Sequence, residues 1–138
     1  MAEQKSVLVA DDSHNDFLVF QLACRKAGWP HKLFRVHDGE EALAYLKGDP
    51  PFADRELWPF PDIVVLDAKM PKMNGFELLM SLRERADILV PIVMLSGSIV
   101  SEDKSRALRL GAADYLTKPA ETSEMVALVQ SIEQRWLR

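Results

Sequence analysis

Five polar side chains each follow a short apolar run in this chain. They are Asp11 and Asp12 after SVLVA, Asp67 after DIVVL, Ser96 after PIVML, and Lys118 after DYLT. A short continuous apolar run is typical of a buried strand, and burying an unpaired carboxylate is costly. Acids at the ends of such strands therefore need a cation, a partner or access to solvent. The five residues predict a polar site at the strand ends.

Three carboxylates, an ammonium group and a hydroxyl together favour phosphoryl chemistry. Two carboxylates about 4 Å apart repel each other by roughly 4 kcal/mol at an effective dielectric constant near 20, unless a proton or a cation intervenes. Mg²⁺ prefers oxygen ligands and completes its shell with phosphate oxygens. A carboxylate can then attack phosphorus to give an acyl phosphate, provided that the metal, an ammonium and a hydroxyl neutralise the transferring group. Asp67, Lys118 and Ser96 meet these needs.

The five apolar runs are predicted to be strands of one parallel sheet. They cover 6–10, 32–36, 62–67, 91–96 and 114–118. The segments between them carry helix signals, and four of these begin with a capping residue: Ser13, Asp38, Asn74 and Ser101. Regular alternation of strand and helix is typical of an α/β protein with a doubly wound parallel sheet and helices on both faces. Ligands of such sheets bind outside the carboxyl ends of the strands, where the polar residues lie.

Length and composition exclude several classes of protein. The 138 residues suit one domain, and the net charge of −4 is poor for binding a nucleic-acid backbone. No apolar stretch reaches the length of a signal peptide or a membrane span, so we expect a cytoplasmic protein with no nucleic-acid or membrane partner. The single cysteine, Cys24, falls in a helical pattern and is interpreted as a buried apolar residue.

Four segments in this order resemble the receiver domain of two-component response regulators. They are ADD at 10–12, VVLDAKMPKMNGFELL at 64–79, VMLSGS at 93–98 and GAADYLTKP at 111–119. The resemblance runs from about Val7 to the end and leaves no room for an effector domain, so we expect a single receiver domain over 1–138. It implies a flavodoxin-like fold, a five-stranded parallel sheet with strand order 2-1-3-4-5.

The resemblance also implies roles for the site residues. Asp67 would accept a phosphoryl group from a phosphohistidine on a sensor histidine kinase, so the protein would be a signalling module and not a turnover enzyme. The implied Mg²⁺ ligands are the side chains of Asp11, Asp12 and Asp67 and the backbone carbonyl of Lys69. Ser96 and Tyr115 would form a switch. On phosphorylation the Ser96 hydroxyl would move to a phosphate oxygen and the Tyr115 ring would turn inward, which would remodel the face made by the fourth helix, the fifth strand and the fifth helix.

Two features depart from the family pattern. Lys69 places a positive charge close to the phosphoryl group, and we expect it to alter the lifetime of that group. The link at 48–61 contains four prolines and is unusually long. With the acidic start of the first helix, this link resembles that of the small receivers that partner bacterial phytochromes. Three aromatic residues are expected to fold the link onto the body of the protein: Phe52, Trp58 and Phe60.

Other interpretations of the same residues stay open. A phosphatase of the haloacid-dehalogenase type also uses a strand-end aspartate, Mg²⁺ and a lysine, but it needs a second acid where this chain has Lys69. A phosphate-independent pseudo-receiver would lack site residues that are present here. A flavodoxin-like cofactor binder would need a phosphate loop after the first strand, where ADDSHND would repel phosphate. Trp136, near the terminus, is compatible with a contact between two copies of the chain in a homodimer.

Overall fold

Five parallel strands form the central sheet of the computed structural model, which describes residues 4–138. The strands are β1 (Ser6–Ala10), β2 (Lys32–Val36), β3 (Ile63–Leu66), β4 (Ile92–Ser96) and β5 (Asp114–Thr117). Their spatial order is β2-β1-β3-β4-β5, with every neighbouring pair parallel. The doubly wound fold and the strand order 2-1-3-4-5 expected from the sequence are confirmed. The order reverses between β1 and β3, which is where this class of sheet binds its ligands.

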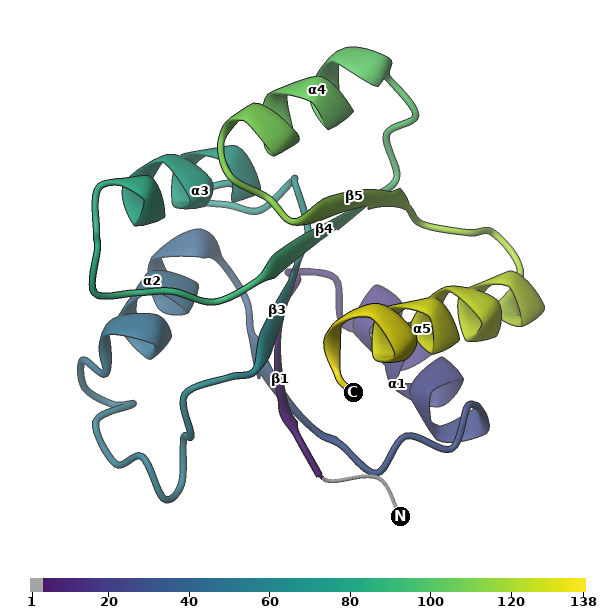
Figure 1. Ribbon diagram of the computed structural model, residues 1–138, viewed down its shortest axis with the longest axis horizontal. Coiled ribbons are helices and arrows are strands. Elements are labelled where there is room, and N and C mark those ends of the chain that lie inside the picture. The colour runs from purple at the N-terminus through teal and green to yellow at the C-terminus, as the bar shows by residue number, and fades with distance from the viewer. Residues whose placement is uncertain (1–3) are drawn as a thin grey trace.

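Over the described residues 4–138, five helices cover the two faces of the sheet. They are α1 (His14–Lys26), α2 (Gly39–Lys47), α3 (Gly75–Arg83), α4 (Ser101–Arg109) and α5 (Thr122–Trp136). Figure 1 shows α1 and α5 side by side on one face and α2, α3 and α4 on the other. Alternate residues of the inner strands point to opposite faces, so Val7 and Val65 pack under α1 and α5 whereas Leu8 and Val64 pack under the other three helices.

Three of the four predicted helix caps are confirmed. The side chains of Ser13, Asp38 and Asn74 accept hydrogen bonds from backbone N–H groups in the first turns of α1, α2 and α3. The prediction for Ser101 is wrong, because Ser101 is the first residue of α4 and Val100 is its N-cap, with no side-chain cap bond. The hydroxyl of Ser98 instead accepts a hydrogen bond from the Val100 N–H at 3.3 Å.

The proline-rich link at 48–61 lies against α2 and β2. Phe52 is buried, and its ring packs against those of Tyr45 and Trp58 at centroid distances of 5.0 and 5.5 Å. The hydroxyl of Tyr45 donates to the carbonyl oxygen of Pro59 at 2.9 Å, which fixes the far end of the link. Phe60 departs from expectation, since it is 40% exposed and lies against a guanidinium group.

The C-terminal helix closes one side of the core. Met125, Val129 and Ile132 are buried along its inner face, as the helical spacing predicted. Trp136 is half-buried against the same core. Over residues 4–138, no helix combines the length and the apolar character needed to cross a membrane.

Candidate functional site

The parallel register brings the ends of the strands to one edge of the sheet. Ala10 of β1 pairs with Leu66 of β3, so Asp11 and Asp67 follow directly at the same level. The backbone N–H of Asp67 donates to the Ala10 carbonyl at 2.9 Å, which extends the ladder by one residue. At the other side, the N–H of Lys118 donates to the Ser96 carbonyl at 2.7 Å. Residues far apart in the sequence therefore meet because each directly follows, or ends, a buried strand.

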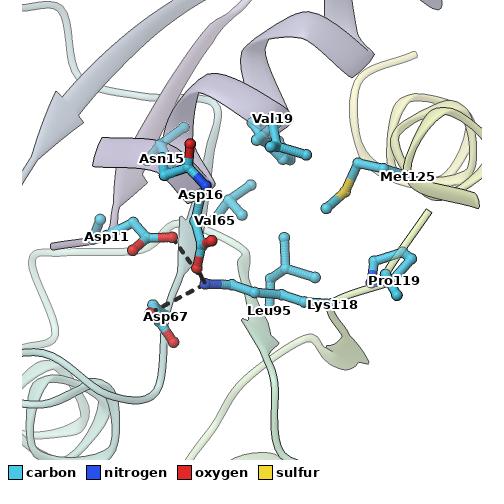
Figure 2. Close-up of a pocket in the computed structure, with 14 residues that line it drawn as sticks. Asp11, Asn15, Asp16, Val19, Val65, Asp67, Leu95, Lys118, Pro119 and Met125 are labelled. Carbon is cyan, nitrogen blue, oxygen red and sulfur yellow. Dashed lines mark hydrogen bonds and ion pairs between the residues drawn. The ribbon is translucent and has the colours of Figure 1, made fainter. Parts of the chain in front are cut away.

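Lys118 is the centre of this site. Its ammonium nitrogen lies 3.0 Å from an oxygen of Asp11, 2.9 Å from one of Asp16 and 3.2 Å from one of Asp67 (Figure 2). The Lys118 side chain is only 16% exposed, and those of Asp11 and Asp67 are 8% and 10% exposed. One cation thus offsets part of the repulsion among three carboxylates in a largely buried setting.

A cavity of about 250 Å³ lies beside the ammonium group, between α1, α5 and the edge of the sheet. Its polar wall holds the three carboxylates that Lys118 contacts and the amide of Asn15. The apolar side chains in its lining include those of Val19, Val65, Leu95 and Met125. The carboxylates of Asp11, Asp16 and Asp67 therefore line one cavity together with Lys118.

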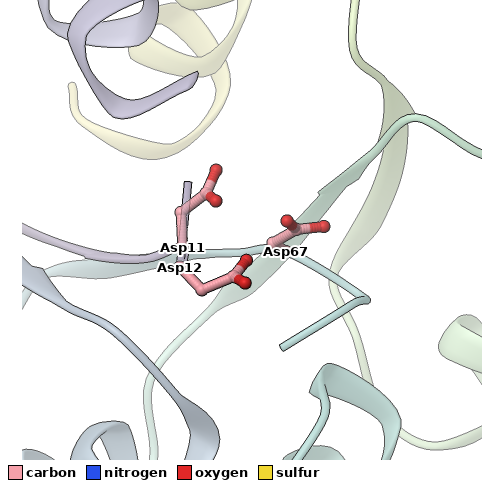
Figure 3. A group of neighbouring side chains, drawn as sticks. All are labelled: Asp11, Asp12 and Asp67. Carbon is pink, nitrogen blue, oxygen red and sulfur yellow. The ribbon is translucent and has the colours of Figure 1, made fainter. Parts of the chain in front are cut away.

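Asp11, Asp12 and Asp67 form an acidic cluster on the same edge. One carboxylate oxygen from each lies within 4.8 Å of the others (Figure 3). Asp11 and Asp67 are buried, whereas Asp12 is exposed. Three carboxylates close together, two of them desolvated and one open to water, are a donor set that suits a hard divalent cation such as Mg²⁺. The cluster therefore fits a divalent metal ion.

The site shifts the pKa values of its two central groups. Burial raises the pKa of the Asp67 carboxyl, the charge of Lys118 opposes that change, and the charge of Asp11 adds to it. For Lys118, burial by itself lowers the pKa, but hydrogen bonds to Asp16 and Asp11 and the charge of Asp67 outweigh it, so the pKa is raised. Lys118 therefore stays protonated, and a divalent cation at the cluster would favour the ionised form of Asp67.

Of the two expected switch residues, Ser96 is the last residue of β4 and Tyr115 is the second residue of β5. Ser96 is buried, and its hydroxyl accepts a hydrogen bond from the Ser98 N–H at 3.2 Å. The ring of Tyr115 is 5% exposed and therefore points inward, and its hydroxyl donates to the Ser98 carbonyl at 3.0 Å. Both residues contact Ser98, one through its backbone N–H and the other through its carbonyl.

Lys69 presents its backbone to the site and its side chain to water. Its N–H donates to an oxygen of Asp67 at 3.2 Å, while its side chain is exposed. The loop that carries Lys69 is held by Gly39, whose N–H donates to the Met73 carbonyl at 2.8 Å. A β-carbon on Gly39 would overlap the Met73 carbonyl, so this contact requires glycine.

Sequence reasoning missed two of these residues. The sequence indicates Asp16 only as part of the acidic start of the first helix, yet its carboxylate binds Lys118. The signal that could have found it is its place in the first turn of a helix that begins beside the acidic strand end. Gly39 carried no signal in a single sequence, because its role depends on a loop that lies 34 residues later, at Met73.

The sheet order and the acidic edge with its lysine define a receiver fold. The family model for the response regulator receiver domain matches residues 7–130. The chain belongs to this family and is a two-component response regulator, a signalling protein. The haloacid-dehalogenase and flavodoxin-like cofactor interpretations are therefore wrong.

Relatives show how far the similarity extends. Rcp1, a response regulator of Synechocystis sp., is 30% identical over 134 residues, which cover 96% of this chain and 89% of Rcp1. PhoP of Bacillus subtilis, an alkaline phosphatase synthesis transcriptional regulatory protein, is 35% identical over 131 residues, which cover 95% of this chain. Those residues cover 49% of PhoP, so the chain spans about half the length of that relative.

Solved structures agree with the sequence comparison. The phosphorylated cyanobacterial phytochrome response regulator RcpA has a TM-score of 0.87 and 32% identity, with 98% of this chain and 95% of RcpA covered. The Mn²⁺-bound form of Rcp1 has a TM-score of 0.83 and 30% identity, with 97% and 95% covered. The similarity to these small response regulators thus extends over nearly the whole chain.

Proposed function

We propose that Asp67 is the phosphoacceptor of this response regulator. One of its carboxylate oxygens attacks the phosphorus of a phosphohistidine on a sensor histidine kinase. The P–O bond forms as the P–N bond breaks, and the imidazole leaves with the electron pair. The observation that carries this proposal is the Lys118 ammonium held between Asp11 and Asp67 at the carboxyl edge of the sheet.

Lys118 and the acidic cluster supply the charge that this reaction needs. Lys118 can turn from a carboxylate to an oxygen of the phosphoryl group, because its ammonium is already at 3.2 Å from Asp67. Asp11, Asp12 and Asp67, with the Lys69 carbonyl, would hold Mg²⁺, and the Mn²⁺-bound form of the similar Rcp1 supports a divalent ion here. When bound, the metal would supply positive charge that offsets the negative charge of the transferring phosphoryl group.

The proposed switch follows from the same geometry. When the Ser96 hydroxyl turns to bind a phosphoryl oxygen, it releases the Ser98 N–H that it accepts at 3.2 Å. The expected inward turn of Tyr115 does not apply, because its side chain is already buried with its hydroxyl donating to the Ser98 carbonyl; Tyr115 would instead respond to the movement of Ser98. The consequence is a change in the loop after β4 and in the face made by α4, β5 and α5, which would bind a partner.

The partner we propose is a sensor histidine kinase of the phytochrome type. The support is the near full-length similarity to RcpA and Rcp1, of which RcpA is a phytochrome response regulator. In this proposal residues 1–138 act as one receiver domain, and the exchange takes place in the cytoplasm, without nucleic acid or membrane. A homodimer in which the half-buried Trp136 takes part is a further element, and sedimentation that shows only monomer with and without a phosphoryl mimic would exclude it.

One experiment tests the phosphoacceptor directly. The protein is incubated with Mg²⁺ and acetyl phosphate, and the added mass is located by peptide mapping. We expect it on the peptide that contains Asp67, and Asp67→Asn should abolish it. A wild-type protein that takes up no phosphoryl group, yet binds its partner, would be a pseudo-receiver.

A further inference from the structure

Asp16 contacts the site lysine but stands apart from the metal cluster. Its carboxylate is 2.9 Å from the Lys118 ammonium, a distance as short as those to Asp11 and Asp67. Within residues 4–138, the acids grouped closely enough to share a metal ion are Asp11, Asp12 and Asp67, and Asp16 is not among them. Figure 2 shows the Asp16 side chain reaching Lys118 from α1, the helix beside the cavity.

The three carboxylates that contact Lys118 change in different ways during the proposed reaction. An ammonium has three N–H donors, and each has a carboxylate within hydrogen-bond distance here. Asp67 becomes an acyl phosphate, and Asp11 is shared with the metal. Asp16 is the one partner of the three that neither reacts nor binds the cation, so its bond to Lys118 can last through the whole cycle.

The backbone around Asp16 holds this residue in a fixed position at the start of α1. Its N–H donates to the Ser13 hydroxyl at 3.1 Å, which holds the first turn of α1. The helix itself is anchored by buried Phe20 and Cys24 against the core that it shares with α5. A flexible lysine side chain that is tied to such a point has fewer rotamers to search when a phosphoryl group arrives.

We propose that Asp16 is a positioning residue, which holds the Lys118 ammonium on the α1 side of Asp67 so that it meets the incoming phosphoryl group. This inference rests on the proposed function of Asp67 and Lys118. The Asp16 side chain is 46% exposed, so solvent screens its charge and its effect comes mainly from geometry.

The test compares Asp16→Asn and Asp16→Glu with the wild-type protein. The rate of phosphorylation by acetyl phosphate is measured at saturating Mg²⁺, and Mg²⁺ affinity is measured separately by calorimetry. For Asp16→Asn we expect the rate to fall by about threefold to thirtyfold, because a displaced ammonium meets the phosphoryl group less often. Mg²⁺ affinity should change by less than about threefold, since Asp16 is outside the metal cluster. Asp16→Glu keeps the charge and should recover part of the rate.

A second readout separates positioning from a structural defect. The ¹⁵N signal of the Lys118 ammonium should be observable in the wild-type protein and broaden in Asp16→Asn, because a freed ammonium exchanges its protons with water. The control is Asp87→Asn, which removes a carboxylate 3.3 Å from Arg85 in an exposed pair elsewhere. The helix cap is unaffected in Asp16→Asn, since that bond uses the backbone N–H of residue 16.

The outcomes distinguish this inference from the function it rests on. A wild-type protein that accepts no phosphoryl group would overturn the proposed function itself. A wild-type protein that is phosphorylated on Asp67, together with an Asp16→Asn variant that reacts at the same rate, would overturn the role of Asp16 alone. A rate loss in Asp16→Asn that is matched by an equal loss of Mg²⁺ affinity would overturn it as well, because Asp16 would then act through the metal.

Discussion

The hydroxyl of Ser98 donates a hydrogen bond to a carboxylate oxygen of Asp103 at 2.7 Å, and this bond ties the loop after β4 to the first turn of α4. The same hydroxyl accepts the Val100 N–H. The backbone of Ser98 contacts both proposed switch residues, Ser96 and Tyr115. Ser98 therefore connects the end of the sheet to the start of α4, and a change at the phosphoryl site can reach the helix through it.

Replacing Ser98 by alanine should loosen the start of α4. The variant loses the bonds to Asp103 and to the Val100 N–H, and loss of a side-chain hydrogen bond costs about 1 kcal/mol of unfolding free energy. Urea unfolding measures the loss of unfolding free energy, and amide hydrogen exchange in the first turn of α4 measures the loosening of the helix start. Ser101→Ala is the matched control, because Ser101 makes no cap bond, and it should stay within about 0.5 kcal/mol of wild type. Equal losses in the two variants would contradict the role of Ser98.

Replacing Lys69 by alanine should change the lifetime of the phosphoryl group. The exposed Lys69 side chain follows the proposed phosphoacceptor by two residues, and we expect its charge to act on the transferring group and on the attacking water. We expect the decay rate of phosphorylated protein to change by about threefold or more. Lys72→Ala is the control, since Lys72 lies in the same loop with its ammonium 3.9 Å from Asp38. Identical decay in wild type and Lys69→Ala would dispose of this idea.

Replacing Gly39 by alanine should displace the loop that follows Asp67. The added methyl group overlaps the Met73 carbonyl, and the Gly39 N–H bond to that carbonyl is lost as the backbones separate. Overpacking of this kind costs about 1–3 kcal/mol, and the phosphorylation rate should fall with it. Gly97→Ala is the control for folding, because its added methyl group meets no atom within 4 Å. Thermal unfolding that ranks the two variants equally would rule out the close approach as the cause.

Stability should decline at alkaline pH because of Cys24. Burial raises the pKa of the Cys24 thiol well above its ordinary value of about 8.5. The unfolded chain therefore loses this proton at a lower pH than the folded protein does. The stabilising contribution is complete below about pH 8.5 and is lost as pH rises above it, by up to about 1.4 kcal/mol per pH unit.

Urea unfolding with a reductant, at about pH 7 and about pH 10, measures this decline. Cys24→Ala should be less stable than wild type at the lower pH, since a buried sulfur is lost, but should show a smaller decline. Tyr45 adds to the loss of stability at higher pH than Cys24 does. Burial raises the pKa of Tyr45 to about 12, although the charge of Arg55 opposes this rise. If the stability of Cys24→Ala falls as much with rising pH as that of the wild-type protein, the alkaline loss of stability comes from other groups.

The order of elements and most of the site could be predicted because they depend on local patterns. An apolar run of four to six residues forms a strand, and parallel strands end at one edge, so the residues after them gather there. That reasoning placed Asp11, Asp67 and Lys118 together, and the structure has all three within one set of short contacts. It failed at Ser101, where local spacing suggested a cap but Ser98 binds the start of the helix instead.

Over residues 4–138, the sequence by itself determined the five strands, the five helices and which acids and lysine lie at the sheet edge. Only the tertiary structure decided that Lys118 is shared with Asp16, 102 residues away, and that Gly39 closes on Met73. The physical reason is the sequence separation over which each kind of interaction acts. Strand and helix patterns depend on residues a few positions apart, whereas these contacts exist only after α1 has packed against α5 and the loops have closed over the carboxyl edge.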